Sequence, residues 1–247
     1  MTDASTDRQL AWYAALLRRA DGLREGFVGA VVADVGAHVG ALSEGFASAV
    51  GREGRVISIE PLRSNVGRIE ARIAAGGHAH WSVRSVAISD HAGTLALRVA
   101  RFDDGWSSAV AGVRDGGAVR IEVPCLRLVD AVPDATVVKL DIEGHEYAVL
   151  DDALEAMPGV CAWLLELHML VDGSRPLQGV IGRLRRAGFD VRAAGRSAGD
   201  PHGPWRAVPI DERLDWSQIP WAQARAAQGQ GAPGSVKSLH VVALRER

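Results

Sequence analysis

Residues 31–40 read VVADVGAHVG, a short apolar run followed at once by a turn that contains glycine. Gly36 allows the backbone to turn tightly and to approach a ligand, and Gly40 allows a helix to begin close against the strand. A second apolar run, VISI at 56–59, ends on Glu60. An acid at this position is well placed to accept hydrogen bonds from both hydroxyls of a ribose. Strand, glycine turn, helix, strand and acid, in this order, predict a βαβ unit that binds a nucleoside.

The rest of the chain continues the alternation of strands and helices. Such elements with short links predict an α/β fold, a doubly wound and mostly parallel sheet covered by helices on both faces. A long connection before the last strand allows that strand to run antiparallel near the C-terminus. Helices are expected at 9–24, 42–50, 64–75 and 176–187, with another after residue 144, and strands at 31–35, 55–60, 81–88, 94–99, 119–126, 137–141, 160–167, 189–193 and 238–245.

Composition narrows the class of protein. The chain has 247 residues, of which 47% are hydrophobic, enough for a substantial core. A net charge of −2 argues against a nucleic-acid binder that relies on phosphate attraction. The polar N-terminus lacks the apolar core of a signal peptide, and no apolar run reaches membrane-spanning length. We expect a cytoplasmic protein without nucleic-acid or membrane partners, with a homo-oligomer as an open alternative.

A second acidic strand end lies at residues 137–150, VVKLDIEGHEYAVL. The apolar strand ends on Asp141, whose charge must be solvated, paired or bound, and Gly144 predicts a sharp turn before the next helix. Ligands of α/β proteins bind outside the carboxyl ends of the strands, which makes Asp141 a candidate for chemistry. Glu143 and Glu146 are three residues apart and are expected to repel each other at the helix start, unless the helix dipole simply accommodates them.

The spacing of the glycines favours one nucleoside over another. A dinucleotide fingerprint requires G-x-G-x-x-G to make room for a pyrophosphate, whereas three residues separate Gly36 from Gly40. Asp34 would repel a pyrophosphate, but it suits the cationic sulfonium and amino-acid portion of S-adenosylmethionine. A nicotinamide-dependent oxidoreductase is therefore the weaker alternative, and a non-catalytic nucleoside-binding module is a third.

Four segments together resemble the FkbM family of S-adenosylmethionine-dependent methyltransferases: DVGAHVG at 34–40, SIEP at 58–61, VAISD at 86–90 and KLDIEGHE at 139–146. The resemblance runs from about residue 31 to residue 189. It implies a seven-stranded class I (Rossmann-like) methyltransferase sheet and, usually, O-methylation of a hydroxyl on a sugar or natural product.

The resemblance also implies residues for the cofactor, with Glu60 on the ribose and residues 87–90 near the adenine. His38 departs from the family's turn, where Asn is the more familiar residue, and we expect it to shape the turn rather than to catalyse. Residues 1–30 are expected to form a helical extension and 31–247 the methyltransferase domain, with 195–235 as an irregular insertion and candidate lid. The expected cofactor residues are Asp34, Gly36, Ala37, His38, Gly40, Glu60, Ala87, Ile88 and Asp90.

Methyl transfer to a hydroxyl requires removal of its proton, and the two acidic strand ends supply candidates. Alternation along the strand at 160–167 predicts Glu166 and His168 on one face, beside Asp141. In the first hypothesis Asp141 or His168 removes the proton, and Glu143 and Glu166 help to orient the hydroxyl. In the second, Asp141, Glu166 and His168 hold Mg²⁺ or Mn²⁺, which binds the acceptor oxygen. In the third, these side chains form only a polar network that closes the sheet end.

Overall fold

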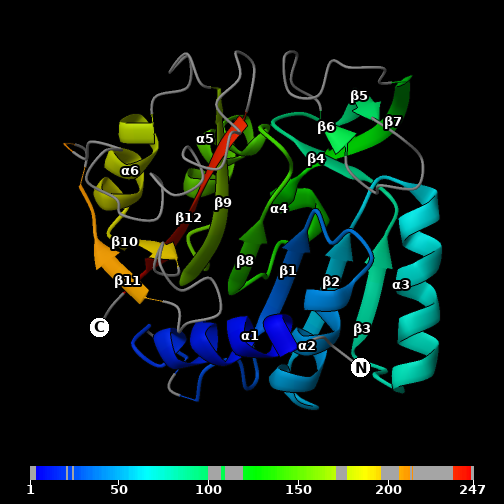
Figure 1. Cartoon of the computed structure of the whole chain (residues 1–247), viewed down its shortest axis with the longest axis horizontal. Helices are drawn as coiled ribbons and strands as arrows, with labels where there is room; N and C mark the ends of the chain where they lie inside the picture. The colour runs from blue at the N-terminus through cyan, green and yellow to red at the C-terminus, as the bar shows by residue number, and fades with distance from the viewer. Residues whose placement is uncertain are drawn as a thin grey trace.

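The computed structural model describes residues 4–99 apart from 21 and 24, together with 107–108, 119–170, 177–195, 206–211, 213 and 236–245. In this part of the chain two sheets form (Figure 1). The larger has eight strands, in the order β11 (Arg206–Pro209), β10 (Asp190–Gly195), β12 (Val236–Leu244), β9 (Ala162–Leu170), β8 (Val137–Leu140), β1 (Val31–Val35), β2 (Arg55–Ile59) and β3 (Trp81–Arg84). The smaller has four, in the order β4 (Ala87–Ser89), β7 (Val119–Arg127), β5 (Gly93–Val99) and β6 (Ser107–Ser108).

The larger sheet confirms the expected doubly wound α/β fold. Strands β9, β8, β1, β2 and β3 run parallel to one another, and β12 lies between β9 and β10, antiparallel to both. The expected seven strands are thus present with an antiparallel strand near the C-terminus. An eighth, β11, pairs antiparallel with β10 at the sheet edge, within a stretch that was expected to be irregular.

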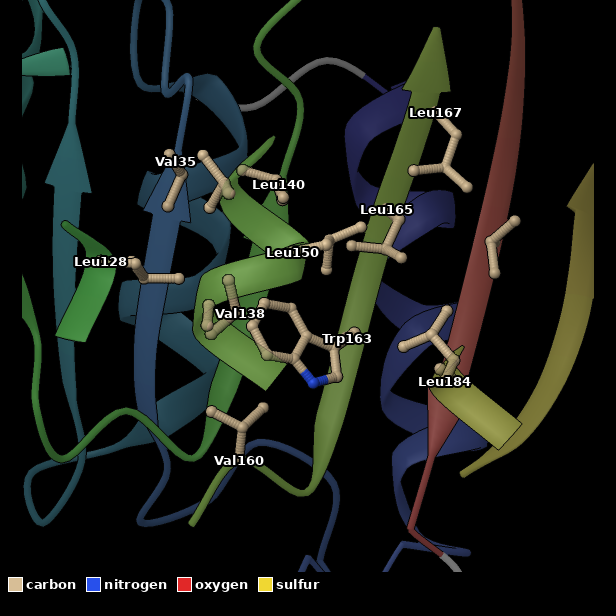
Figure 2. Packing of buried hydrophobic residues seen from close by; sticks show 14 of the residues in the cluster. Val35, Leu128, Val138, Leu140, Leu150, Val160, Trp163, Leu165, Leu167 and Leu184 are labelled. Atoms are coloured by element: carbon tan, nitrogen blue, oxygen red, sulfur yellow. The ribbon is translucent and has the colours of Figure 1, made fainter. Parts of the chain in front are cut away.

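Helices cover both faces of the larger sheet. They are α1 (Ala4–Leu17), α2 (Ala41–Val50), α3 (Arg63–Gly76), α4 (Leu128–Ala131), α5 (Glu146–Ala156) and α6 (Leu177–Arg186). On β1, Val35 points into the core formed with α4, α5 and α6, where it joins Leu150 and Trp163 (Figure 2). Val32 points to the opposite face, where Phe46 of α2 packs together with residues of α1 and α3. This alternation along one strand buries both faces and holds the strand ends rigidly in place.

Two expected boundaries are wrong, and tertiary pairing explains both. The expected strand at 81–88 divides into β3, which extends the larger sheet beside β2, and β4, which pairs with β7 in the smaller sheet. The segment, WSVRSVAI, contains no glycine or proline that would mark this break. The expected helix at 9–24 is α1, which both starts and ends earlier. The chain turns after Leu17 through a hydrogen bond from the amide of Ala20 to the carbonyl of Leu17, and Gly22 follows with φ 78°.

Other expectations concern segments that lie largely outside the described residues. Most of the insertion expected at 195–235 falls there, including Trp205, Trp216 and Trp221, so the candidate lid stays a prediction. Among the described helices, none has both the length and the hydropathy to cross a membrane.

Candidate active site

The turn after β1 packs directly against the end of β8. Gly36 has φ 75°, and a Cβ built on it would lie 1.8 Å from the carbonyl oxygen of Asp141. Only glycine fits where these two strand ends meet. His38 has φ 52°, in the left-handed region of the backbone map. His, Asn and Asp adopt this conformation more often than bulkier residues do. This backbone conformation explains why a histidine can stand where the family's turn more often has Asn.

Asp34 anchors a buried chain of hydrogen bonds across the sheet. Ser43 of α2 donates to Asp34 Oδ2 at 2.5 Å, Ser58 of β2 donates to Ser43 at 2.7 Å, and the indole nitrogen of Trp81 donates to Ser58 at 2.7 Å. Asp34 Oδ1 lies 3.3 Å from the ammonium of Lys139 on β8. Asp34, which was expected to attract a cationic cofactor, therefore already has the Lys139 cation beside it. Its hydrogen bonds also hold α2 and β2 in place next to β1.

Glu60 is buried at the end of β2, with 4% of its surface exposed. Its Oε2 accepts from the amide of His38, and its Oε1 accepts from the amide of Leu62, both at 3.0 Å, and from the Asn65 amide group at 3.3 Å. Burial outweighs these hydrogen bonds and raises the pKa of Glu60 to about 7. The carboxylate is held in a fixed orientation, and its charge state changes near neutral pH.

If Glu60 binds the ribose of S-adenosylmethionine, as the sequence predicts, this pKa predicts that affinity for the demethylated product, S-adenosylhomocysteine, rises with pH. Ribose hydroxyls donate hydrogen bonds, which the ionised Glu60 accepts better than the protonated acid does. Ionisation through a pKa of about 7 should make binding about tenfold tighter at pH 8 than at pH 6. Because the folded state retains a proton that the unfolded chain releases near pH 4.5, the cofactor-free fold should lose stability as pH rises between these two pKa values.

Titration calorimetry at pH 6, 7 and 8 measures the effect on binding. In Glu60→Gln the affinity should be weaker and independent of pH over this range. A wild-type affinity that stays constant between pH 6 and pH 8 would contradict the role given to Glu60.

Two cavities adjoin at the carboxyl ends of β1 and β8. The nucleoside cavity, of about 200 Å³, is lined by Glu60, by Ala87 and Ile88 of β4, and by Leu95 and Leu97 of β5, among others. The helix cavity, of about 270 Å³, lies against α1, and its lining includes Thr6, Gln9, Tyr13, Asp34, Ala37 and Lys139. Gly36, His38, Asp141 and Glu166 line both cavities. These four residues mark the junction between the cavities.

Glu146 organises the loop that follows β8. It is fully buried, and its Oε1 accepts hydrogen bonds from the amides of Ile142 and Gly144, both at 3.0 Å. The same oxygen lies 2.9 Å from Nδ1 of His168 on β9. The Glu146 side chain therefore faces the loop backbone and the imidazole. Glu143 has a left-handed backbone conformation, with φ 55°. The two acids therefore lie on different sides of His168, with Glu146 near Nδ1 and Glu143 near Nε2.

His168 is surrounded by carboxylates. Its Nε2 lies 3.6 Å from Glu143 Oε2 and 3.8 Å from Glu166 Oε1. Burial disfavours the charged imidazole, but the hydrogen bond and charge of Glu146, with the charges of Asp141 and Glu143, outweigh it and raise the pKa of His168 to about 10. An imidazolium cannot accept a further proton, so His168 is a poor candidate for the base while it carries this charge.

Asp141, in contrast to His168, is a carboxyl group that can accept a proton. Burial raises the pKa of its carboxyl, opposed by Lys139 and reinforced by Glu166. Its Oδ2 lies 3.5 Å from the Lys139 ammonium, which also donates to the carbonyl of Gly36 at 2.9 Å. Burial disfavours the charge on Lys139 as well, but Asp34 and Asp141 outweigh that effect and raise its pKa. Asp141 is thus a carboxylate of raised basicity, positioned by a permanent cation.

The structure brings most of the predicted site residues together, but three of them line neither cavity. Among the described lining residues of the two cavities, Gly40, Asp90 and His168 do not occur. His168 is buried behind the cavity wall, where its Nε2 lies 3.6 Å from Glu143 Oε2. A Cβ on Gly40 would contact Ile69 and Trp81, so this glycine serves helix packing. The Asp90 side chain is 54% exposed and bonds to His91, beyond the end of β4.

Two residues of the site were missed by the sequence reasoning. Lys139 and Glu146 both lie within residues 137–150, the second acidic strand end, yet the sequence did not assign either of them a role in the site. A lysine within an apolar strand was a usable signal, because a buried ammonium requires carboxylates around it. Nothing local in the sequence reveals that Glu146 reaches back to Ile142 and across to His168.

Comparison with known proteins decides the family. The model of the methyltransferase FkbM domain matches residues 34–191, more than half of the chain. The chain belongs to the FkbM methyltransferase family. It is therefore a methyltransferase that uses S-adenosylmethionine. A search of curated proteins found no significant match to this FkbM methyltransferase.

Solved structures resemble the FkbM methyltransferase only distantly. Precorrin-6y C5,15-methyltransferase from Geobacter metallireducens GS-15 is 13% identical, with a TM-score of 0.45 over 99% of this chain and 94% of that one. An S-adenosylmethionine-dependent O-methyltransferase from Thermotoga maritima is 13% identical, with a TM-score of 0.45 over 100% and 67%. A dimethyladenosine transferase from Plasmodium falciparum is 11% identical, with a TM-score of 0.48 over 99% and 62%. The type of methylation does not follow from likenesses of this size.

The described residues fit the family's cofactor. The buried carboxylate of Glu60 faces the nucleoside cavity, whose walls at Ala87, Ile88 and Leu95 suit an adenine. The helix cavity, with polar groups of α1 and the Gly36 turn, suits an amino-acid portion. A sulfonium that links these two parts would lie at the junction.

Proposed function

We propose that the chain transfers the methyl group of S-adenosylmethionine to a hydroxyl of a sugar or another small natural product. The observation that carries this proposal is the position of Asp141 and Glu166, the two carboxylates that line both cavities. A nucleoside in one cavity and an amino acid in the other would place the reactive methyl beside them. The resemblance to the FkbM family supports oxygen as the acceptor atom.

The residues around the junction suggest how the reaction would proceed. Bound S-adenosylmethionine supplies an electrophilic methyl carbon, whose bond to sulfur breaks as the acceptor oxygen attacks. Asp141 accepts the hydroxyl proton, which its raised pKa favours. Lys139 holds Asp141 against the Gly36 turn, so that the base and the cofactor turn keep a fixed relation. Positioning of this kind can contribute much of the acceleration of a displacement.

The experiment compares ligands and then acceptors. We expect S-adenosylhomocysteine to raise the melting temperature and NAD to leave it unchanged, because only a ligand specific for the native state stabilises it. Incubation with radiolabelled methyl donor and a panel of sugars and polyols should then label at least one hydroxyl compound.

Each alternative has its own outcome in this experiment. Stabilisation by NAD alone would contradict the proposal and favour the oxidoreductase. Binding of S-adenosylhomocysteine without transfer to any acceptor would favour a non-catalytic binding module. Labelling of amines alone would show that the acceptor atom is nitrogen and not oxygen.

We also propose that the enzyme works in the cytoplasm on a small molecule, without nucleic-acid or membrane partners.

A further inference from the structure

Three side chains at the ends of β8 and β9 converge on one point. Asp141, Glu143 and His168 each place one ligand atom so that all three atoms lie within 4.8 Å of one another. We propose that these three residues bind a divalent cation of the Mn²⁺ type at the wall of the nucleoside cavity. This inference rests on the proposed function, because the cation would meet the acceptor oxygen beside the methyl donor.

The imidazole is oriented as in histidine ligands of metal sites. The buried Glu146 lies 2.9 Å from Nδ1 of His168, which leaves Nε2 directed toward Glu143 at 3.6 Å. A carboxylate on the far nitrogen of a metal-binding histidine fixes the ring and raises its basicity. Because Glu146 also binds the amides of Ile142 and Gly144, it fixes the loop that carries the two carboxylate ligands. One side chain thus positions all three ligands.

The charge around this point also favours a cation. Four carboxylates gather here, those of Asp141, Glu143, Glu146 and Glu166, and each lies against His168 or Lys139. Lys139 divides its charge among Asp141, Asp34 and the carbonyl of Gly36. Carboxylates removed from bulk water require compensation, and a divalent ion among them would supply it.

The ligand set differs from the one that the sequence suggested. Glu143 takes the place expected for Glu166, because its left-handed backbone returns the side chain toward His168. Glu166 lies between two imidazoles, with Oε1 3.8 Å from Nε2 of His168 and Oε2 3.7 Å from Nε2 of His240 on the neighbouring strand β12. Glu166 remains beside the site as a carboxylate that can receive the acceptor's proton while Asp141 holds the ion.

Two carboxylate oxygens and one imidazole nitrogen favour Mn²⁺ over Mg²⁺ or Ca²⁺, which prefer oxygen alone. Three protein ligands leave coordination positions open toward the cavity. An acceptor hydroxyl bound there would have a lowered pKa, which is a recognised contribution of metal ions to catalysis. The site thus deepens the proposed reaction by naming what activates the hydroxyl.

Direct metal binding tests this proposal without reference to turnover. The full chain, freed of metal by chelation, is titrated with Mn²⁺, and electron paramagnetic resonance follows the loss of the free-ion signal. We expect one tight site per chain and a ¹⁴N coupling from His168 in the pulsed spectrum of the wild type. Glu143→Gln should weaken binding at least about tenfold, and Glu146→Gln about 10–100-fold although it touches no ion. The control is Glu44→Gln, which removes a carboxylate of α2 that pairs with Arg72 of α3, and this variant should bind Mn²⁺ as the wild type does.

The outcomes separate this inference from the proposed function. Mn²⁺ that stays free at millimolar concentration, or binds without ¹⁴N coupling, overturns the site. If S-adenosylhomocysteine still stabilises a protein that fails this metal test, the proposed function stands and Asp141 acts as the base without a metal. Mn²⁺ binding with the expected coupling, in a protein that neither binds S-adenosylhomocysteine nor transfers methyl groups, supports the site and overturns the proposed function. The wild-type coupling decides the matter even where a variant fails to fold.

Discussion

Asp141→Asn is expected to lower kcat by about 10²–10⁴-fold, the usual contribution of a positioned acid or base. The amide preserves the size of the side chain but can neither take the hydroxyl proton nor contribute a charged ligand. Affinity for S-adenosylhomocysteine should change by less than about threefold, because Glu60 and the Gly36 turn, which carry most of the cofactor contacts that we propose, stay intact. Single-turnover transfer of labelled methyl groups and calorimetry measure the two quantities separately.

Asp151→Asn provides the matched control. Asp151 lies on the exposed side of α5 and pairs with Arg183, away from both cavities. The same chemical change there should leave turnover unaffected. An Asp141→Asn enzyme with wild-type kcat would remove Asp141 from the reaction, and a parallel loss of cofactor affinity would make it a binding residue instead.

The arrangement of the larger sheet was predictable because its signals are local. The run from Val31 to Gly40 and the acid at Glu60 specify a βαβ unit on their own, and β8 and β9 repeat the apolar pattern. The break between β3 and β4 was not predictable in this way. Residues 81–88 contain no glycine or proline that would divide them, and only the pairing of β4 with β7 assigns the second half to another sheet. Register and sheet membership depend on partners that lie far away in the sequence.

The candidate site was predictable to the same extent. Parallel strands end at one edge, so Asp141, Glu166 and His168 were expected to be neighbours, and the distances agree with that expectation. The roles within the cluster depend on turn geometry that residue types do not reveal. Glu143 and Glu146 are both acids at a helix start, yet one faces the cavity and the other is fully buried under the loop. A positive φ at Glu143 separates them.

Gly36→Ala is expected to cost about 4 kcal/mol or more of folding free energy, at the upper end for single substitutions. A left-handed backbone costs a residue with a Cβ about 1–2 kcal/mol. The added carbon would also stand 1.8 Å from the carbonyl oxygen of Asp141, which is backbone and cannot rotate away. For a chain of this size the melting temperature should fall by about 10 °C or more, as thermal unfolding monitored by circular dichroism would measure.

Gly67→Ala makes the same change in the opposite setting. Gly67 lies within α3, and a Cβ there meets nothing within 4 Å. Alanine should stabilise this exposed helical position by about 0.5–1 kcal/mol, which raises the melting temperature by a few degrees. If both variants melt like the wild type, the junction of β1 and β8 is not packed as described. If Gly36→Ala folds stably but no longer binds S-adenosylhomocysteine, the strand ends have parted locally, and the close approach serves the site more than the fold.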